Sequence, residues 1–193
     1  MRAQLAMLVV VGAALAAAGC RADRETTTAR YELGRSATPT EIASLDTDVR
    51  PDGHGLPTGH GSVATGTMLY QQKCQMCHGT KGEGLPPAYP ALIGRDPAGE
   101  QFPFAKDFKI TKTIGNYWPY ATTVFDYVRR AMPHPAPGSL TNDEVYALTA
   151  YLLAANKVIA ADAVLDSASL MQVKMPYHDR FVPDTRRGGA ELK

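Results

Sequence analysis

Residues 74–78 read Cys74-Gln75-Met76-Cys77-His78, and this Cys-x-x-Cys-His stretch decides the fold. Two thiols three positions apart, at the end of a helix, can reach the two vinyl groups on one side of a porphyrin. The adjacent histidine then lies beneath the iron, and this spacing is the attachment signature of c-type haem. We therefore predict one covalent haem c on Cys74 and Cys77, with His78 as an axial ligand of the iron.

Two other kinds of site use cysteines at this spacing. A structural zinc site needs four ligands, most often from two such pairs, and the sequence contains only one further cysteine, Cys20. A thioredoxin-like redox motif is expected next to β-strands, which the sequence around residues 74–78 does not indicate. The haem interpretation is therefore preferred. The odd number of cysteines, three, also argues against a disulfide framework.

Apolar residues at helical spacing predict three helices around the motif. One leads from residue 63 to Cys74, and a second covers residues 120–131 and ends at a Met-Pro dipeptide. The third starts after Thr141, which forms a capping box with Glu144, and it ends at Asn156 and Lys157. The sequence therefore predicts an all-α domain over residues 62–157. The apolar positions that support it are Val63, Gly66, Leu69, Tyr70, Val124, Tyr127, Val128, Val145, Leu148, Tyr151 and Leu152.

The second axial ligand decides the chemistry of a haem. Met132 stands in a rigid Met-Pro segment between two predicted helices, and a thioether ligand there raises the haem potential and closes the iron to substrates. Met175, also followed by proline, and His134 are the alternatives. Met76 lies inside the attachment loop and Met68 suits the core of the first helix. We therefore predict His78 and Met132 as the two iron ligands.

The amino-terminal residues predict export. Arg2 is followed by an almost unbroken small or apolar run over residues 5–18, which ends directly before Gly19-Cys20. This pattern is typical of a bacterial lipoprotein signal peptide over residues 1–19, with lipid attached to Cys20. The alternative is an ordinary secretory signal that is cleaved near Ala18. Either signal places the protein in the periplasm, and the first one anchors it to a membrane.

The remaining segments flank the predicted domain. Residues 20–61 are polar and rich in turns, without an apolar period, and are predicted to be a tether. Residues 158–193 are predicted to be a C-terminal extension with a polar end from Asp184 and a few apolar anchors, namely Leu165, Leu170, Val173 and Phe181. The formal net charge of +1 gives no basic excess of the kind that nucleic-acid binding requires. We therefore expect no nucleic acid among the partners.

A family resemblance adds to these observations. Residues 62–156 resemble a class I cytochrome c domain, and Pro90-Ala91-Leu92-Ile93-Gly94 is similar to the Pro-x-Leu-x-Gly segment of that family. The resemblance implies that the carbonyl of Pro90 accepts a hydrogen bond from His78 and fixes its ring. It also implies a crossing of the first and last helices at Gly66, Tyr70, Leu148 and Tyr151.

A narrower resemblance covers about 130 residues. It is carried by residues 51–57, 82–84, 114–123, 126–133, 139–152 and 175–184. These stretches resemble the cytochrome subunit of bacterial sulfite dehydrogenase and the dihaem cytochrome subunit of sulfane dehydrogenase. In that family the methionine of the Arg-Ala-Met-Pro segment, here Met132, is the iron ligand. The sulfane dehydrogenase subunit has two haem motifs, whereas this sequence has one.

The Tyr117-Trp118-Pro119-Tyr120 cluster has two interpretations that do not exclude each other. It is either aromatic core or a wall of the haem pocket, with the polar end of Trp118 or a tyrosine near a haem propionate. We include Trp118 among the predicted haem-binding residues.

The resemblance implies a periplasmic electron carrier, not itself an enzyme. Its donor would be a molybdenum-dependent dehydrogenase for sulfite or another sulfur compound, and its acceptor a cytochrome or oxidase of the respiratory chain. The alternatives are a catalytic haem protein, either a thiosulfate-oxidising cytochrome or a peroxidase-like one, and a haem sensor. A peroxidase needs an open iron, which Met132 would close, and a sensor needs an output domain that the sequence does not contain.

Overall fold

The computed structural model describes residues 34–95 and 104–182. The chain divides into two compact units, Met1–Ile42 and Ala43–Lys193. Helix α2 (Pro39–Leu45) begins in the first unit, where the carboxylate of Glu41 accepts a hydrogen bond from the backbone N–H of Thr38 at 2.8 Å. Within the described ranges, no helix is long and apolar enough to cross a membrane. The predicted signal peptide and Cys20 lie outside these ranges.

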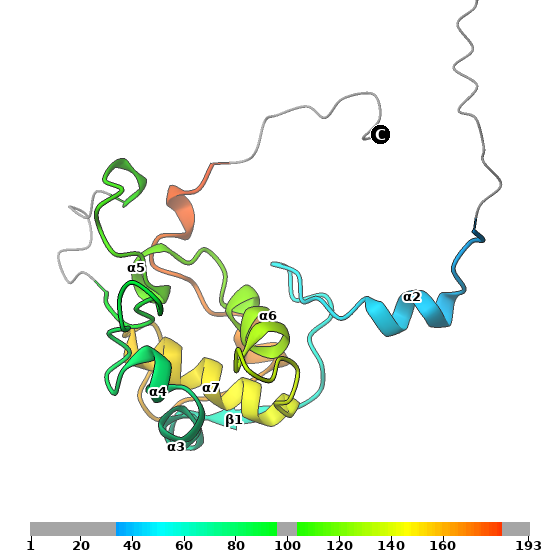
Figure 1. Ribbon diagram of the computed structural model, residues 1–193, viewed down its shortest axis with the longest axis horizontal. Coiled ribbons are helices and arrows are strands. Elements are labelled where there is room, and N and C mark those ends of the chain that lie inside the picture. Colours follow the sequence, from blue (N-terminus) through cyan, green and yellow to red (C-terminus); the bar gives the residue numbers. More distant parts are fainter. Residues whose placement is uncertain (1–33, 96–103, 183–193) are drawn as a thin grey trace, which may run out of the picture. The chain divides into compact units, whose positions relative to one another are not determined.

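The second unit is mostly helical, with one small antiparallel sheet (Figure 1). This agrees with the all-α fold class that the sequence predicts. In chain order its elements are β1 (His60–Ser62), α3 (Val63–Lys73), α4 (Gln75–His78), the 3₁₀ turn η2 (Phe104–Lys106), α5 (Ile114–Tyr117), α6 (Ala121–Ala131), α7 (Asn142–Ala155), β2 (Val164–Asp166), α8 (Ser167–Met171) and the 3₁₀ turn η3 (His178–Arg180).

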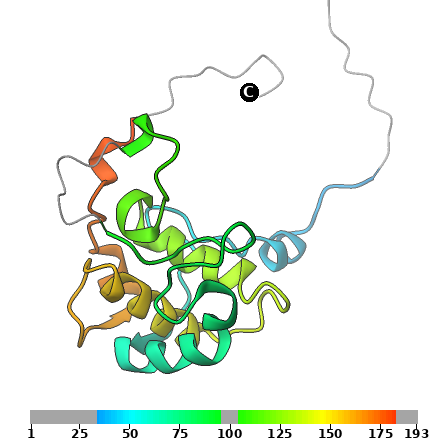
Figure 2. The ribbon, with the colours of Figure 1, turned by 60° about the vertical axis from the view of Figure 1, so that its left-hand side comes forward.

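Helix α7 is the centre of the core. Its N-cap Thr141 and Glu144 form the predicted capping box, in which each side chain bonds the other residue's backbone N–H. Figures 1 and 2 show α7 between α3 on one side and α6 on the other. Most of its side chains are buried, which explains why the helix is apolar on nearly every face. The buried residues are Val145, Tyr146, Ala147, Leu148, Thr149, Ala150, Leu152 and Leu153.

Helices α3 and α7 cross where a glycine removes the side chain between them. A Cβ atom on Gly66 would lie 1.9 Å from the backbone oxygen of Ala147 and 2.8 Å from the Cβ of Tyr151. One turn further on, the rings of Tyr70 and Tyr151 pack with their centroids 4.8 Å apart. The helix crossing that the family resemblance implied is therefore present.

Helix α6 packs on the opposite side of α7. It begins at Ala121, one residue after the predicted start, and ends at Ala131 as expected. Phe125 is fully buried, and its ring lies 4.5 Å from that of Tyr146 between centroids. Helix α6 thereby fixes the position of the residue that follows it, Met132.

The last part of the predicted tether is packed against the domain, which differs from the predicted domain start at residue 62. Val49 is 3% exposed, and its backbone N–H donates to Asp126 at 2.7 Å. The hydroxyl of Tyr146 donates to the carbonyl of Pro57 at 2.8 Å. This segment is held mainly by side chains that bond its backbone, so its sequence carries no apolar period.

The small sheet joins the two flanking segments to each other. Strand β1 pairs with β2 so that Gly61 is opposite Leu165. The extension continues over the domain with further buried residues, of which Leu165 and Leu170 were predicted anchors. Val173 is partly buried, whereas Phe181 is 37% exposed and belongs to an aromatic cluster. In the described part of the extension, residues 158–182, the buried residues are Leu165, Leu170, Met175 and Tyr177.

Candidate haem site

The two motif cysteines and the histidine lie on a single helical turn. Helix α3 ends before Cys74, whose backbone N–H still bonds the carbonyl of Tyr70 at 2.9 Å. The carbonyl of Cys74 then accepts hydrogen bonds from Cys77 and His78 at 3.1 and 3.0 Å. Because residues three and four apart share a helix face, this turn brings both thiols and the imidazole to the same region.

Both motif thiols are free and partly buried. Burial raises the pKa of the Cys74 thiol to about 11. Cysteines that exchange disulfides have lowered pKa values, so the environment of Cys74 does not fit a redox dithiol. No cluster of three or more His, Cys, Asp or Glu residues in the described part of the chain could hold a metal ion. These two cysteines therefore support neither a zinc site nor a redox dithiol as the alternative to haem attachment.

The ring of His78 is fixed from one side. Its Nδ1 lies 2.9 Å from the carbonyl oxygen of Pro90. A carbonyl can only accept, so Nδ1 carries the proton and donates it, which leaves Nε2 as the lone-pair nitrogen that an iron would use. His78 is buried, and the ring of Tyr89 lies edge-on to it at 6.4 Å between centroids. The hydrogen bond between His78 and Pro90 that the family resemblance implied is present.

A glycine-rich loop returns the chain from His78 to Pro90. Gly84 donates its N–H to the carbonyl of His78 at 2.8 Å, and Gly82 accepts from Leu92 at 2.8 Å. Gly82 has a φ of +73°, and a Cβ there would lie 2.5 Å from the side chain of Ile93. Only glycine allows this turn without strain. The loop therefore has the form needed to present the carbonyl of Pro90 to the imidazole.

Asn156 fastens this loop to the end of α7. Its side-chain oxygen accepts from the N–H of Gly94 at 3.0 Å, and its amide nitrogen donates to the carbonyls of Leu92 and Leu152 at 3.1 and 2.8 Å. The residue is 1% exposed, so all its polar atoms depend on these bonds. The sequence predicted only that Asn156 ends the helix. The sequence signal that could have indicated this buried role is the position of Asn156, one turn after Leu152 on the buried face of the helix.

Tyr70 links the helix crossing to the motif. Its hydroxyl donates to the carbonyl of Gly79, directly after His78, at 2.8 Å. Burial raises the pKa of this phenol well above its usual value, with Tyr151, Cys74 and Glu83 adding to the effect. The hydroxyl therefore stays protonated and remains a donor at physiological pH. The position of α4 thus depends on the packing of α3 against α7.

Met132 is the C-cap of α6. Its backbone N–H bonds the carbonyl of Val128 at 3.3 Å, its own backbone is extended, and Pro133 prevents a further helical turn. The side chain is partly buried, whereas His134 is exposed. Met132 thus starts the loop between α6 and α7 from a fixed point.

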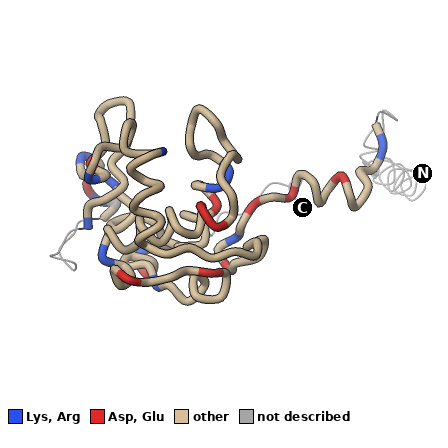
Figure 3. The backbone as a smooth tube through the Cα atoms, turned by 90° about the horizontal axis from the view of Figure 1, so that it is seen from below, with Lys and Arg blue, Asp and Glu red and all other residues tan. Residues whose placement is uncertain are grey.

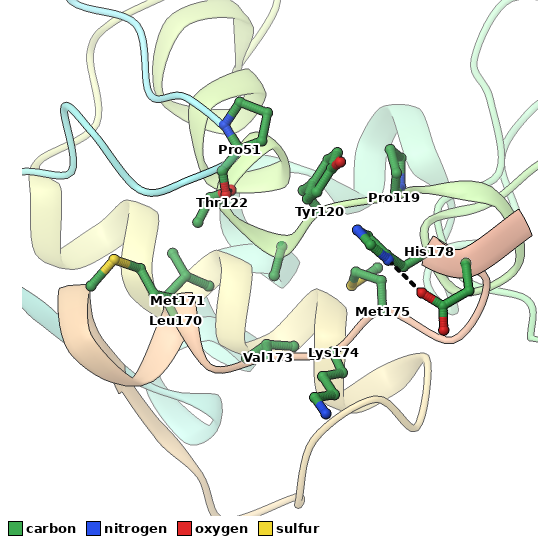
Figure 4. A pocket seen from close by; sticks show the side chains of 12 residues that line it. Pro51, Pro119, Tyr120, Thr122, Leu170, Met171, Val173, Lys174, Met175 and His178 are labelled. Carbon is green, nitrogen blue, oxygen red and sulfur yellow. Dashed lines mark hydrogen bonds and ion pairs between the residues drawn. The ribbon is translucent and has the colours of Figure 1, made fainter. Parts of the chain in front are cut away.

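Met175, the alternative ligand, lies in a different place. It is 5% exposed and lines a groove of about 410 Å³ between the start of α6 and the extension (Figure 4). Tyr120, Thr122 and His178 line the same groove, and none of its lining residues comes from α4 or from the loop after it. The groove is also distinct from the segment that carries Met132.

Trp118 is held by its polar end. Its Nε1 donates to the hydroxyl of Thr123 at 2.8 Å, and its ring lies edge-on to Tyr127 at 5.9 Å between centroids. The side chain is partly buried and packs against the core. In this arrangement Thr123 satisfies the indole N–H, and the predicted contact of Trp118 with haem stays a prediction.

Comparisons with known proteins agree with this geometry. Residues 61–152 match the family model described as cytochrome c oxidase, cbb3-type, subunit III. A chain of the crystal structure of the sulfane dehydrogenase SoxCD from Paracoccus pantotrophus is 44% identical, with a TM-score of 0.69, and the match covers 81% of this chain and 74% of that one. The chain belongs to the c-type cytochromes. No curated protein matched this cytochrome.

Membership of this family settles three of the predictions. The cytochrome has the class I fold, it is related to enzymes of sulfur oxidation, and it binds haem c covalently. The residues present fit that group, since two free thiols and an imidazole with an available Nε2 lie on one turn. Electron transfer follows as its general role.

Proposed function

We propose that this cytochrome carries single electrons on one haem, which it accepts from a molybdenum-dependent dehydrogenase for sulfite or another sulfur compound. It passes them to a cytochrome or oxidase of the respiratory chain. The 44% identity to a chain of sulfane dehydrogenase SoxCD carries this proposal. The sequence contains a single Cys-x-x-Cys-His motif, which supports one haem per chain.

The proposed haem site uses residues from two parts of the fold. Cys74 and Cys77 would hold the group through thioether bonds, and His78 and Met132 would bind its iron. The bound iron supplies a one-electron couple, whose potential a methionine ligand raises. The carbonyl of Pro90 orients the imidazole by accepting a hydrogen bond from Nδ1–H, and Trp118 is proposed as part of the pocket wall. The single-turn geometry of α4 and the fixed end of α6 support this assignment.

The partner contact is proposed to be modest in area and transient. Residues of both charge signs are interspersed along the described chain (Figure 3), and the formal net charge is +1. Long-range steering of the whole molecule is therefore weak. Such a contact suits a carrier that must release each partner after one electron.

We expect the purified oxidised protein to be reduced rapidly by such a dehydrogenase together with sulfite, and not by sulfite or thiosulfate alone. The physical reason is that an iron with two protein ligands offers no site for the sulfur compound. Stopped-flow absorbance of the haem measures the rate. Fast reduction without the enzyme would instead support a catalytic haem protein. Reduction only by a quinol-oxidising complex would retain electron transfer and reject the sulfur assignment.

A lipid anchor in the periplasm is the second part of the proposal. The small-residue run that ends at Cys20 supports lipid on that residue. Cys20→Ser is expected to release the protein from washed membranes while haem content stays normal, because the anchor and the haem motif lie far apart in the sequence. Mass spectrometry of the amino-terminal peptide checks the modification directly. An unmodified Cys20 thiol in the wild-type protein would reject the anchor.

A further inference from the structure

An aromatic lobe lies outside the main core. We define it as residues 104–112, Tyr117 and residues 177–182. Phe104 stacks on Tyr117 at 4.9 Å between ring centroids, and Phe181 lies edge-on to both, at 5.1 and 5.4 Å. In Figures 1 and 2 the loop from η2 and the end of the extension lie side by side. The rings thus join two segments that are far apart in the sequence.

Large apolar side chains are exposed on the outer surface of this lobe. Phe108 is 85% exposed and Val182 is 86% exposed. Phe181, beside Val182, is 37% exposed, and its ring contacts that of Tyr117. Lys112 lies near the rings of both Tyr117 and Phe108 and so connects the two. Exposed large apolar side chains that gather on one part of a protein indicate an interaction surface, whereas single exposed apolar residues need no explanation.

Three lysines belong to the same segment as Phe108, and one of them lies against its ring. The Nζ of Lys112 lies 5.7 Å from the ring centre of Phe108 and 4.7 Å from that of Tyr117. Lys106, Lys109 and Lys112 are exposed, and in the described part of the chain none of them forms an ion pair. The lobe therefore combines an exposed phenylalanine with lysine charges that form no ion pair with a carboxylate of residues 34–95 or 104–182.

The acidic groups of the lobe are already engaged. Asp107 accepts a hydrogen bond from the backbone N–H of Lys109 at 2.9 Å, and Asp179 lies 2.8 Å from Nδ1 of His178. Beside these two carboxylates stand four basic side chains. They are Lys106, Lys109, Lys112 and Arg180. The lobe thus has a local basic excess on a chain whose formal net charge is only +1.

We propose that the aromatic lobe binds the anionic lipid surface of a membrane, with Phe108 entering the headgroup region and the lysines facing lipid phosphates. Lysine with phenylalanine suits this interface, where each basic residue near an anionic surface contributes attraction. Protein–protein interfaces are enriched in phenylalanine but depleted in lysine, so the three exposed lysines are the feature that favours lipid over a protein partner. This contact goes beyond the proposed function, since it does not depend on the lipid at Cys20 or on the sulfur pathway.

The position of the lobe is compatible with electron transfer at the membrane. In Figures 1 and 2 it lies at the end of the second unit opposite α3. Cys74, which follows α3, and the motif therefore lie toward the other end. A cytochrome held by its lobe would keep the haem attachment site directed away from the lipid.

The experiment uses the mature holoprotein without its lipid, made as the Cys20→Ser chain behind a cleavable secretory signal. Binding is measured by co-sedimentation with vesicles of mixed phosphatidylglycerol and phosphatidylcholine, and with vesicles of phosphatidylcholine alone. We expect binding to the anionic vesicles, weak binding to the neutral ones, and release at high salt. Absence of binding to the anionic vesicles would overturn the proposal.

Matched variants test whether the lobe is responsible. Phe108→Ser and Lys109→Glu are each expected to lower the partition coefficient on the order of tenfold. Val164→Ser removes an apolar side chain that is 56% exposed elsewhere, and Arg50→Glu makes the same change in net charge, so both should bind as the parent does. An equal loss in the control variants would refute a local site.

A protein partner at the same surface gives a different result. In that case Phe108→Ser and Lys109→Glu would leave vesicle binding unchanged and slow the reduction of the haem by the donor dehydrogenase. That outcome rejects the lipid proposal. Both residues are exposed, so the variants are expected to fold and to bind haem as the parent does. The visible haem spectrum of each variant, measured in parallel, checks this.

Discussion

Gly66→Val is expected to destabilise the protein by about 3 kcal/mol or more, the upper range for overpacked cores. The Cβ of any side chain at this position would lie 1.9 Å from the backbone oxygen of Ala147. That oxygen belongs to α7 and cannot move without breaking the helix. Helices α3 and α7 would have to separate, and Tyr70 would lose its position against Tyr151. Denaturant unfolding of the holoprotein, followed by circular dichroism, measures the change.

Gly66→Ala is the sharper version of this test, because two effects oppose each other. Alanine is favoured over glycine in a helix by about 1 kcal/mol, so a helix without the crossing would be stabilised. The clash with Ala147 predicts destabilisation instead. Gln72→Ala, at an exposed position of the same helix, serves as the control and should change stability little. A Gly66→Ala protein as stable as the parent would contradict the close packing.

Local signals explain why much of the fold could be predicted. The capping box of Thr141 and Glu144 lies within one turn, and the sequence located the start of α7 to the residue. Helix α6 ended where Met132-Pro133 indicated. Each of these features depends on residues close together in the chain. Propensity and capping therefore determine them before any tertiary contact forms.

Non-local contacts explain what the sequence did not predict. Val49 and Pro57 are held by Asp126 and Tyr146, more than 70 residues further along the chain. Such bonds leave no periodic pattern in the bonded segment, so its packed part was interpreted as tether. Two hydrogen bonds of the Asn156 side chain, with Gly94 and Leu92, connect α7 to the loop after Pro90 in the same way.

In the candidate site, too, the features set by neighbouring residues could be predicted from the sequence, and the contacts between distant residues could not. The thiols and His78 could be assigned from five consecutive residues, since one helical turn brings them together. The bond from His78 to Pro90 came from the family resemblance, and the structure contains it. The contact of Trp118 with Thr123 was not foreseen, because an aromatic cluster does not specify which polar group meets the indole. The axial role of Met132 remains a prediction.

Met132→Ala is expected to open the iron to carbon monoxide and to lower the reduction potential. Removing the thioether leaves His78 as the only protein ligand, and a weaker ligand such as water then takes the second axial position. The fall in potential should be on the order of 0.1 V, within the roughly 0.8 V range that axial ligands control. Visible spectra with and without carbon monoxide, and a redox titration, measure both effects.

Two controls separate Met132 from the other candidate ligands. Met175→Ala should leave the spectrum and the carbon monoxide response unchanged, because Met175 lines a groove with Tyr120 and His178, apart from α4. His134→Ala should do the same, since the side chain of His134 is exposed, two residues after Met132. The assignment is wrong if either control opens the iron while Met132→Ala leaves it closed. Met175→Ala is expected to reduce stability by about 2–5 kcal/mol, as for other buried methionines, so stability and ligation can be told apart in the same protein.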